Sequence, residues 1–188
     1  MKKIIVILLI AIILLGSLLG FRLFKGDQAA DAALEDNAVV NEPAVEENAD
    51  EAYDGLSFST TALDGSAVDE SIFEGKSLVM LNFWEPWCGP CVQEMPDLQR
   101  LYEDYAEKGF LIVGVYSTES GAANIVEQNG ITYPIIKYCD DFSLFRTGYV
   151  PTTAFVDGSG QTVGELVVGA KSYDDWAALI EQLMSGLD

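Results

Sequence analysis

The 188-residue sequence contains no histidine and only three cysteines. The lack of histidine excludes Ser-His and Cys-His catalysis, His-ligated zinc or copper, and the C-x-x-C-H haem attachment motif. Basic residues are also scarce, because 10 Lys and Arg stand against 30 Asp and Glu, for a formal net charge of -20. Since binding a phosphate backbone requires clustered Lys and Arg, we expect no nucleic acid partner.

The few basic residues near the N-terminus flank a long apolar run. Residues 1–25 contain no acidic residue, and residues 4–21 carry no charge and are rich in Ile and Leu. As a helix this run would be about 27 Å long, which is enough to cross a bilayer. We therefore predict a membrane-anchoring transmembrane helix over residues 1–25, with the N-terminus in the cytoplasm and the rest of the chain outside it. The alternative is a cleaved secretory signal, which would release the rest of the chain.

Residues 26–54 have the opposite charge. They contain ten acidic residues and no basic one, with few large apolar side chains. Such a segment buries too little apolar surface to offset the entropy of ordering it. We predict an acidic disordered linker, and a docking segment for a basic partner is the alternative.

The remaining residues, 55–188, alternate between short apolar runs and amphipathic stretches. Strands are predicted at 56–61, 78–84, 110–116, 133–138, 152–156 and 161–168. Helices are predicted from Cys88 to just before Gly109, at 121–128 and at 173–184. The last two strands face each other across an Asp-Gly-Ser-Gly turn, which predicts a hairpin. This order implies an α/β domain with a mixed central sheet and helices on both faces.

Two of the cysteines, Cys88 and Cys91, lie where a predicted strand turns into a predicted helix. The unpaired N–H groups and dipole of a helix N-terminus stabilise a thiolate, and in C-x-x-C sites the thiol pKa falls from about 8.5 to roughly 3.5–7.5. Cys88 would attack a substrate disulfide, and Cys91, one turn further on, would resolve the mixed disulfide. A zinc site would need a second C-x-x-C or a His pair, so we expect no metal and no cofactor beyond the redox-active disulfide.

Several motifs beyond the cysteine pair carry a family resemblance. They are N-F-W-x-x-W-C-G-P-C at 82–91, Glu94-Met95-Pro96, Tyr133-Pro134, Tyr149-Val150-Pro151-Thr152-Thr153 and Phe155-Val156-Asp157. With these motifs the globular part resembles the TlpA/ResA-like membrane-anchored thiol-disulfide oxidoreductases of the thioredoxin superfamily. The resemblance implies a thioredoxin-like fold with an extra N-terminal β-hairpin and a central insertion between Phe110 and Tyr149.

The resemblance also implies roles for individual residues. Glu94 matches a family glutamate that tunes the thiol pKa or relays protons, and its alternative role is that of a solvated acid in the first helical turn. Pro151 matches the family's cis-proline, which leaves the backbone before it free to pair with substrate. The predicted substrate-binding residues are therefore Trp87, Gly89, Pro90, Val150 and Pro151.

The implied function is the reduction of disulfides in extracytoplasmic proteins, such as apocytochrome c or other envelope proteins. A membrane electron donor of the CcdA/DsbD type would supply the electrons. The Gly-Pro dipeptide between the cysteines is typical of reducing thioredoxins, but the sequence does not fix the reduction potential. The alternatives are a disulfide-forming oxidant, a peroxiredoxin-like thiol peroxidase, and a non-catalytic thiol- or metal-binding adaptor.

The third cysteine, Cys139, departs from the family pattern. One interpretation is a free, partly buried thiol that behaves as a small apolar residue. The other is a second redox residue that pairs with another chain or with a small thiol.

Overall fold

The computed structural model describes residues 55–187. The predicted anchor at 1–25 and the predicted linker at 26–54 lie outside the described residues. Within residues 55–187, no helix has the length and apolar character needed to span a membrane.

The described residues form a five-stranded mixed sheet, as predicted. Its strands are β3 (Leu78–Trp84), β4 (Phe110–Tyr116), β5 (Ile135–Lys137), β6 (Thr152–Val156) and β7 (Val167–Val168), in the spatial order β5-β4-β3-β6-β7. The pairs β3–β4 and β4–β5 are parallel, whereas β6 is antiparallel to both β3 and β7. Every residue of β3 and β4 is buried, which is why both strands read as continuous apolar runs. These two strands form the centre of the sheet.

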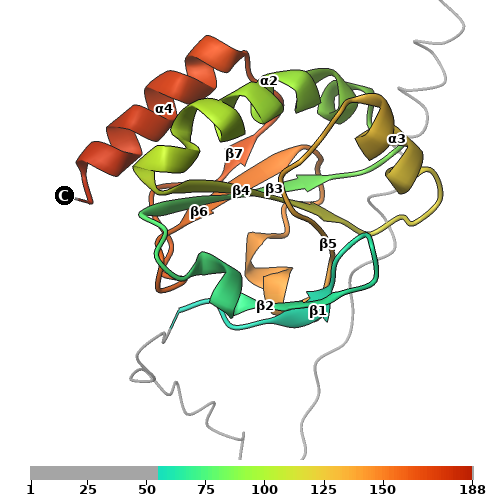
Figure 1. The fold of residues 1–188 in the computed structure, drawn as a ribbon, viewed down its shortest axis with the longest axis horizontal. Coiled ribbons are helices and arrows are strands. Elements are labelled where there is room, and N and C mark those ends of the chain that lie inside the picture. The colour runs from blue at the N-terminus through green and yellow to red at the C-terminus, as the bar shows by residue number, and fades with distance from the viewer. Residues whose placement is uncertain (1–54, 188) are drawn as a thin grey trace, which may run out of the picture. The chain divides into compact units, whose positions relative to one another are not determined.

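The three α-helices within residues 55–187 pack on one face of this sheet (Figure 1). They are α2 (Gly89–Tyr105), α3 (Ala122–Gln128) and α4 (Tyr173–Ser185). Alternate residues of β3, including Leu78, Met80 and Trp84, lie in this helix-covered core. The short 3-10 helix η2 (Ala106–Lys108) follows α2 and ends at Gly109, whose φ of 82° is in the left-handed region. Because α2 starts directly after β3, its N-terminus is fixed at the carboxyl end of the central strand.

The second face of the sheet is covered by 3-10 helices and an N-terminal hairpin. These elements are η1 (Glu70–Phe73), η3 (Asp140–Phe145), and the antiparallel strands β1 (Ser59–Thr61) and β2 (Ala67–Asp69). The ring of Phe58 lies 5.5 Å from that of Phe73 and 4.9 Å from that of Phe142, so aromatic contacts join them. Helices therefore lie on both faces, as predicted, but those on the second face are 3-10 helices.

Three predicted strands are shorter in the structure than in the sequence prediction. The strand predicted at 161–168 reduces to β7, with an isolated bridge from Thr162 to Val156. Gly164, with a φ of 71°, interrupts it, because a left-handed residue breaks the extended backbone. The strands predicted at 133–138 and 56–61 reduce to β5 and β1. The predicted hairpin is present, but its second strand is broken. The region of the implied insertion, between Phe110 and Tyr149, contains β4, α3, β5 and η3.

Candidate redox site

The two cysteines of the C-x-x-C motif are bonded to each other in the structure. The Cys88–Cys91 disulfide has an S–S distance of 2.05 Å and a Cα–Cα distance of 5.3 Å. Cys88 is the N-cap of α2, and its sulfur accepts a hydrogen bond of 3.2 Å from the backbone N–H of Cys91. Pro90 lies in the first turn of the helix, where a missing N–H breaks no helical hydrogen bond. The local sequence therefore begins a helix and closes a disulfide in the same four residues.

The start of α2 favours a thiolate at Cys88 when the disulfide is reduced. No acidic residue lies in the first turn, so nothing there offsets the positive end of the helix dipole. Cys88 is 5% exposed and Cys91 is 1% exposed. Both cysteines are buried in the disulfide, and Cys88 is the more exposed of the two, as expected for an attacking group.

The loop that ends at β6 lies against this disulfide. The Val150–Pro151 peptide bond is cis, and the carbonyl oxygen of Val150 lies 3.6 Å from the Cys88 sulfur. In the disulfide this sulfur carries no proton, so the contact is a van der Waals contact, whereas a reduced Cys88 thiol could donate to the same oxygen. In the structure, Val150 and Pro151 therefore lie beside the cysteine pair, although about sixty positions separate them from it in the sequence.

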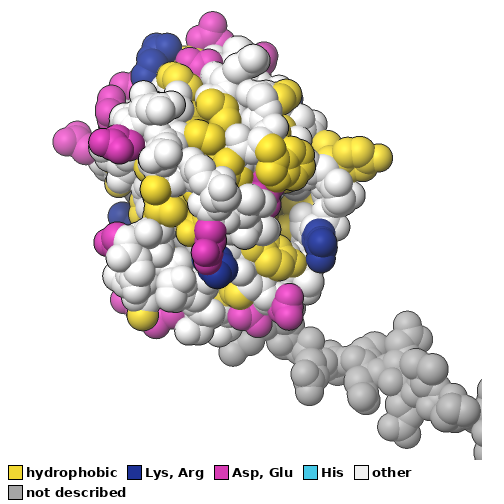
Figure 2. Space-filling model, turned by 90° about the vertical axis from the view of Figure 1, so that its right-hand side faces the viewer, with side chains coloured by type: hydrophobic (Ala, Val, Ile, Leu, Met, Phe, Trp, Pro, Cys, Tyr) yellow, Lys and Arg dark blue, Asp and Glu magenta, His cyan; other side chains and the backbone are white. Residues whose placement is uncertain are grey.

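An open cavity of about 410 Å³ lies beside the disulfide, and we call it the Tyr149 cavity. Its lining includes Phe83, Glu85, Trp87, Phe145, Tyr149 and Val150. Trp87 and Tyr149 are 70% and 72% exposed, which is unusual for side chains of this size. Figure 2 views the side on which β3 ends and α2 begins, and hydrophobic side chains gather across that face. Of the other predicted substrate-binding residues, Gly89 is exposed beside Cys88 and Pro90 lines a different cavity.

Glu94 is buried behind the disulfide and is not a solvated acid of the helix surface. It is 3% exposed, and as the third residue after Cys91 it lies on the same side of α2. Its Oε1 accepts a hydrogen bond of 3.2 Å from Asn82 Nδ2 in β3. Its Oε2 accepts bonds of 3.2 Å from the backbone N–H of Lys171 and 3.4 Å from the indole N–H of Trp176. The carboxyl group is therefore fixed by hydrogen bonds from the sheet and from residues at the start of α4.

Burial raises the pKa of Glu94 above its ordinary value. The hydrogen bonds from Asn82, Lys171 and Trp176 act in the opposite direction, because they stabilise the carboxylate, and the negative charge of Asp97 adds to the rise. A buried carboxyl group with a raised pKa keeps its proton to a higher pH than an exposed one, so it is suited to proton transfer.

Two features of the site were not predicted from the sequence. Glu85, directly after β3, is only 8% exposed, and its two oxygens accept the backbone N–H groups of Ser117 and Thr118 at 3.1 and 3.0 Å. The other feature is the pair of α4-side donors to Glu94. Both sets of contacts join residues more than thirty positions apart, so no local pattern could have indicated them.

Cys139 is a free, partly buried cysteine beside the second-face core. Its sulfur lies 3.6 Å from a carboxylate oxygen of Asp141, and burial raises the pKa of the thiol. A raised pKa makes a thiol less reactive at neutral pH. Its role as a second redox residue stays a prediction. Among residues 55–187, no cluster of three or more His, Cys, Asp or Glu side chains could hold a metal ion.

The fold and the bonded cysteine pair at a helix N-terminus define a thiol-disulfide oxidoreductase with a thioredoxin-like fold. The comparisons with known proteins agree. The family model described as Redoxin matches residues 28–137. The chain belongs to this family, and within it to the TlpA/ResA-like proteins of the thioredoxin superfamily.

Two curated relatives are named thiol-disulfide oxidoreductase ResA. The protein from Oceanobacillus iheyensis is 40% identical over 116 residues, which cover 60% of this chain and 59% of that protein. The protein from Bacillus thuringiensis is 32% identical over 130 residues, which cover 67% of this chain and 74% of that protein. A crystal structure of a thiol:disulfide interchange protein from Chlorobium tepidum is 27% identical, with a TM-score of 0.61, and the match covers 69% of this chain and 94% of that one.

Replacing Glu94 with Gln is expected to change how stability depends on pH. A raised pKa means that the folded state holds its proton at pH values where the unfolded state has lost it, so the wild type loses stability as pH rises above about 4.5. The Glu94→Gln variant has no ionisable group at this position, so its stability does not fall with pH for this reason. The free energy of unfolding of Glu94→Gln minus that of the wild type should therefore increase between pH 4 and pH 8, by about 1.4 kcal/mol for each unit by which the pKa is raised.

Urea unfolding of both oxidised proteins at several pH values measures this difference. Because all other groups are common to both proteins, their contributions cancel. A difference that stays constant or falls with pH would contradict the raised pKa.

Proposed function

We propose that the protein reduces disulfide bonds of protein substrates outside the cytoplasm through the Cys88–Cys91 dithiol. The observation that carries this proposal is the placement of the pair: at the N-terminus of α2, next to a cis peptide bond, and beside the Tyr149 cavity. A cavity of this size with two exposed aromatic rims suits an extended polypeptide segment. The ResA relatives carry the name of the same reaction class.

The proposed reaction proceeds by two exchanges. The Cys88 thiolate attacks one sulfur of the substrate disulfide, forming a mixed disulfide, and the other substrate sulfur leaves with the electron pair and takes up a proton. Cys91 then loses its proton and attacks the Cys88 sulfur. The Cys88–Cys91 bond forms, the bond to substrate breaks, and the second substrate sulfur leaves and is protonated. The dithiol loses two electrons and the substrate gains them.

The oxidised pair must then be reduced again for a second turnover. We propose a membrane electron donor of the CcdA/DsbD type, whose own dithiol would reduce Cys88–Cys91 by the reverse exchange. Apocytochrome c and other envelope proteins with disulfides are the proposed substrates. Trp87, the residue before Cys88, lines the Tyr149 cavity and is 70% exposed, which supports contact with both kinds of partner.

Among the alternatives is a thiol peroxidase, and the Redoxin family match alone does not distinguish it from an oxidoreductase. The bonded partner cysteine three residues after Cys88 favours exchange between disulfides, because any oxidised Cys88 is resolved within the same helical turn. An adaptor without catalysis would not need a bonded cysteine pair at a helix N-terminus, where a thiolate is stabilised. A disulfide-forming oxidant has the same geometry and differs only in reduction potential.

Replacing Cys91 with Ser should trap the mixed disulfide, because the resolving thiol is lost while Cys88 remains. With reduced full-length Cys91→Ser and a disulfide-bonded protein such as insulin, we expect a covalent adduct that disappears when reductant is added. Non-reducing gel electrophoresis and intact mass measure it. Cys88→Ser is the matched control and should form no such adduct. Equal adducts in both variants would place the attack on another residue.

The reduction potential of the pair tests the proposed direction. For a reductase we expect a value near the thioredoxin figure of about -270 mV or lower, measured by equilibrating the full-length protein with dithiothreitol buffers. A value near the DsbA figure of about -120 mV would make the protein an oxidant. A Cys139→Ser background ensures that only the Cys88–Cys91 pair is titrated.

We also propose that residues 1–25 anchor the protein to the cell membrane, with the N-terminus in the cytoplasm and the catalytic domain outside. The apolar run at 4–21 supports this placement. The full-length protein should remain in the membrane fraction after extraction with alkaline carbonate, and protease added to spheroplasts should digest the domain. Release of a shortened, soluble protein would instead support cleavage of a secretory signal.

A further inference from the structure

The two charged residues at the Tyr149 cavity have opposite surroundings. Of the described residues that line this cavity, Glu85 is the one acidic residue and Arg146 the one basic residue. Both oxygens of Glu85 are occupied by the backbone N–H groups of Ser117 and Thr118. Within residues 55–187, by contrast, the Arg146 side chain has no ion pair and lies over no aromatic ring. The cavity therefore presents a cation whose hydrogen-bond donors are unused.

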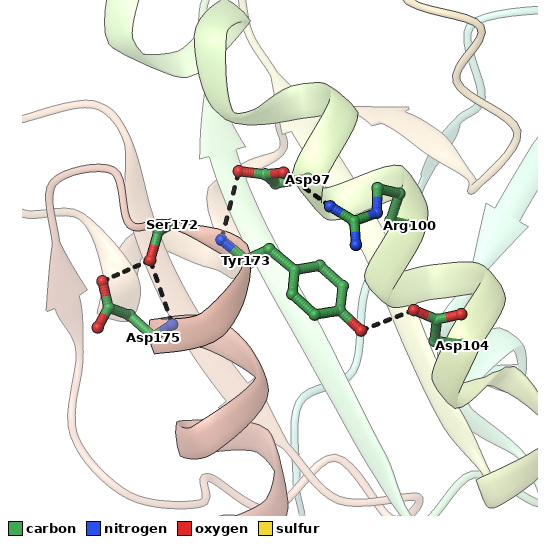
Figure 3. Close-up of polar contacts among 6 residues, drawn as sticks. All are labelled: Asp97, Arg100, Asp104, Ser172, Tyr173 and Asp175. Atoms are coloured by element: carbon green, nitrogen blue, oxygen red, sulfur yellow. Dashed lines mark hydrogen bonds and ion pairs between the residues drawn. The ribbon is translucent and has the colours of Figure 1, made fainter.

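An arginine without a partner is unusual in so acidic a domain. Residues 55–188 contain twenty acidic residues against six basic ones. Arg100, the other arginine of the domain, is engaged by its neighbours (Figure 3). Its ion pair with Asp97 measures 3.7 Å, and its Cζ lies 4.2 Å from the centre of the Tyr173 ring. Arg146 differs from Arg100 because its exposed guanidinium remains available to a molecule that enters the cavity.

The backbone that carries Arg146 is fixed on both sides. Phe145, directly before it, is buried in the second-face core. Thr147, directly after it, has its Oγ1 2.7 Å from Thr152 Oγ1 and accepts the backbone N–H of Tyr149 at 3.3 Å. Because this backbone is already ordered, binding a ligand to the guanidinium costs less conformational entropy than binding it to a mobile loop.

Arg146 also lies within reach of a substrate attached to Cys88. The carbonyl oxygen of Val150 is 3.6 Å from the Cys88 sulfur, and Arg146 precedes Val150 by four residues. Four residues span at most about 14 Å, and an extended substrate advances about 3.3 Å per residue. A side chain within about four positions of the substrate cysteine can therefore reach the Arg146 guanidinium.

From this arrangement we propose that the Tyr149 cavity selects substrate segments that carry an Asp or Glu side chain near the reacting cysteine, and that Arg146 binds this carboxylate. The inference rests on the proposed thiol-disulfide exchange and names the substrate class of the same site. The planar guanidinium donates two parallel N–H groups to the two carboxylate oxygens. Arg146 is thus a specificity-determining residue, and the exchange itself remains with the two cysteines.

The strength of the proposed contact depends on what covers it. Trp87 and Tyr149 line the same cavity and are exposed in the free protein. An apolar stretch of substrate that docks against these rings removes water from the cavity, and an ion pair is stronger where water is excluded. Elsewhere on the domain an acidic side chain meets an excess of negative charge, so Arg146 also disfavours other binding positions.

The test uses short peptides whose single cysteine is activated as a 2-pyridyl disulfide. The Cys88 thiolate attacks the peptide sulfur, and pyridinethione leaves with the electron pair and is measured by its colour. Cys91 then attacks the Cys88 sulfur and releases the peptide thiol. Glu, Gln or Lys occupies each of the four positions before and after the peptide cysteine in turn. All proteins are full-length and reduced, and they carry Cys139→Ser so that the protein has two reactive thiols.

We expect the Glu peptide to react faster than the Gln peptide at one or more positions, by up to about fivefold, as for a partly exposed ion pair. In Arg146→Gln the ratio of these two rates should fall to one or below, because the remaining charges repel the acid. Arg100→Gln is the matched control, since it removes the same charge outside the cavity, and it should keep the parent ratio. A parent ratio of one or below at every position, or equal ratios in the three proteins, would overturn the proposal.

Charge reversal gives an independent test. At the position where the parent protein prefers Glu, Arg146→Glu should prefer Lys over Gln. A changed stability of the Cys88 thiolate would alter the rates of all peptides by the same factor, so it cannot reverse their order. An order that stays as in the parent would therefore contradict direct contact between residue 146 and the peptide side chain.

A further control separates this inference from the proposed function. Cys88→Ser should release no pyridinethione by the first exchange, whichever residue the peptide carries. Release at the parent rate would overturn the proposed exchange itself, whereas lost selectivity with intact exchange would overturn only the role of Arg146. Because the Arg146 side chain is exposed, its replacement is expected to leave the fold intact, which urea unfolding of each variant checks.

Discussion

The chemistry of this domain depends on the junction at which a fully buried strand ends and a helix begins. β3 runs through the centre of the sheet with every residue buried, so its end point cannot shift without disturbing the core. The polypeptide leaves the core there, and Cys88 caps the next helix within four residues of Trp84. A thiol at this place lies at the positive end of a helix dipole, which stabilises its thiolate. The packing of the sheet thus determines where the redox pair lies.

Glu94 connects this junction to the rest of the fold. A buried carboxyl group is costly unless it is hydrogen-bonded, and each of its oxygens has a donor from a different element. Asn82 adds a link to Thr153, two residues after the cis-proline. The dithiol helix, the substrate-side loop and α4 are therefore held together by one buried polar network. A change at any of its members is expected to reach the cysteines through Glu94.

Much of the fold could be predicted from local pattern. The runs that form β3 and β4 are continuous and apolar, and their bounds agree with the structure at both ends. The strand predicted at 161–168 failed because the left-handed backbone of Gly164 interrupts it, and a glycine in a sequence does not reveal its φ angle. The sequence also did not indicate that the helices on the second face are 3-10 helices, or that the Phe58, Phe73 and Phe142 rings meet there, because these contacts join residues far apart in the sequence.

The candidate site, like the fold, could be predicted only where neighbouring residues determine it. The spacing of Cys88 and Cys91 and their position before a helix follow from neighbouring residues, and so their pairing could be anticipated. The donors to Glu94 could not, because Trp176 is 82 positions away and reads as an ordinary apolar residue of an amphipathic helix. The same holds for Glu85, whose two oxygens bind the loop after β4.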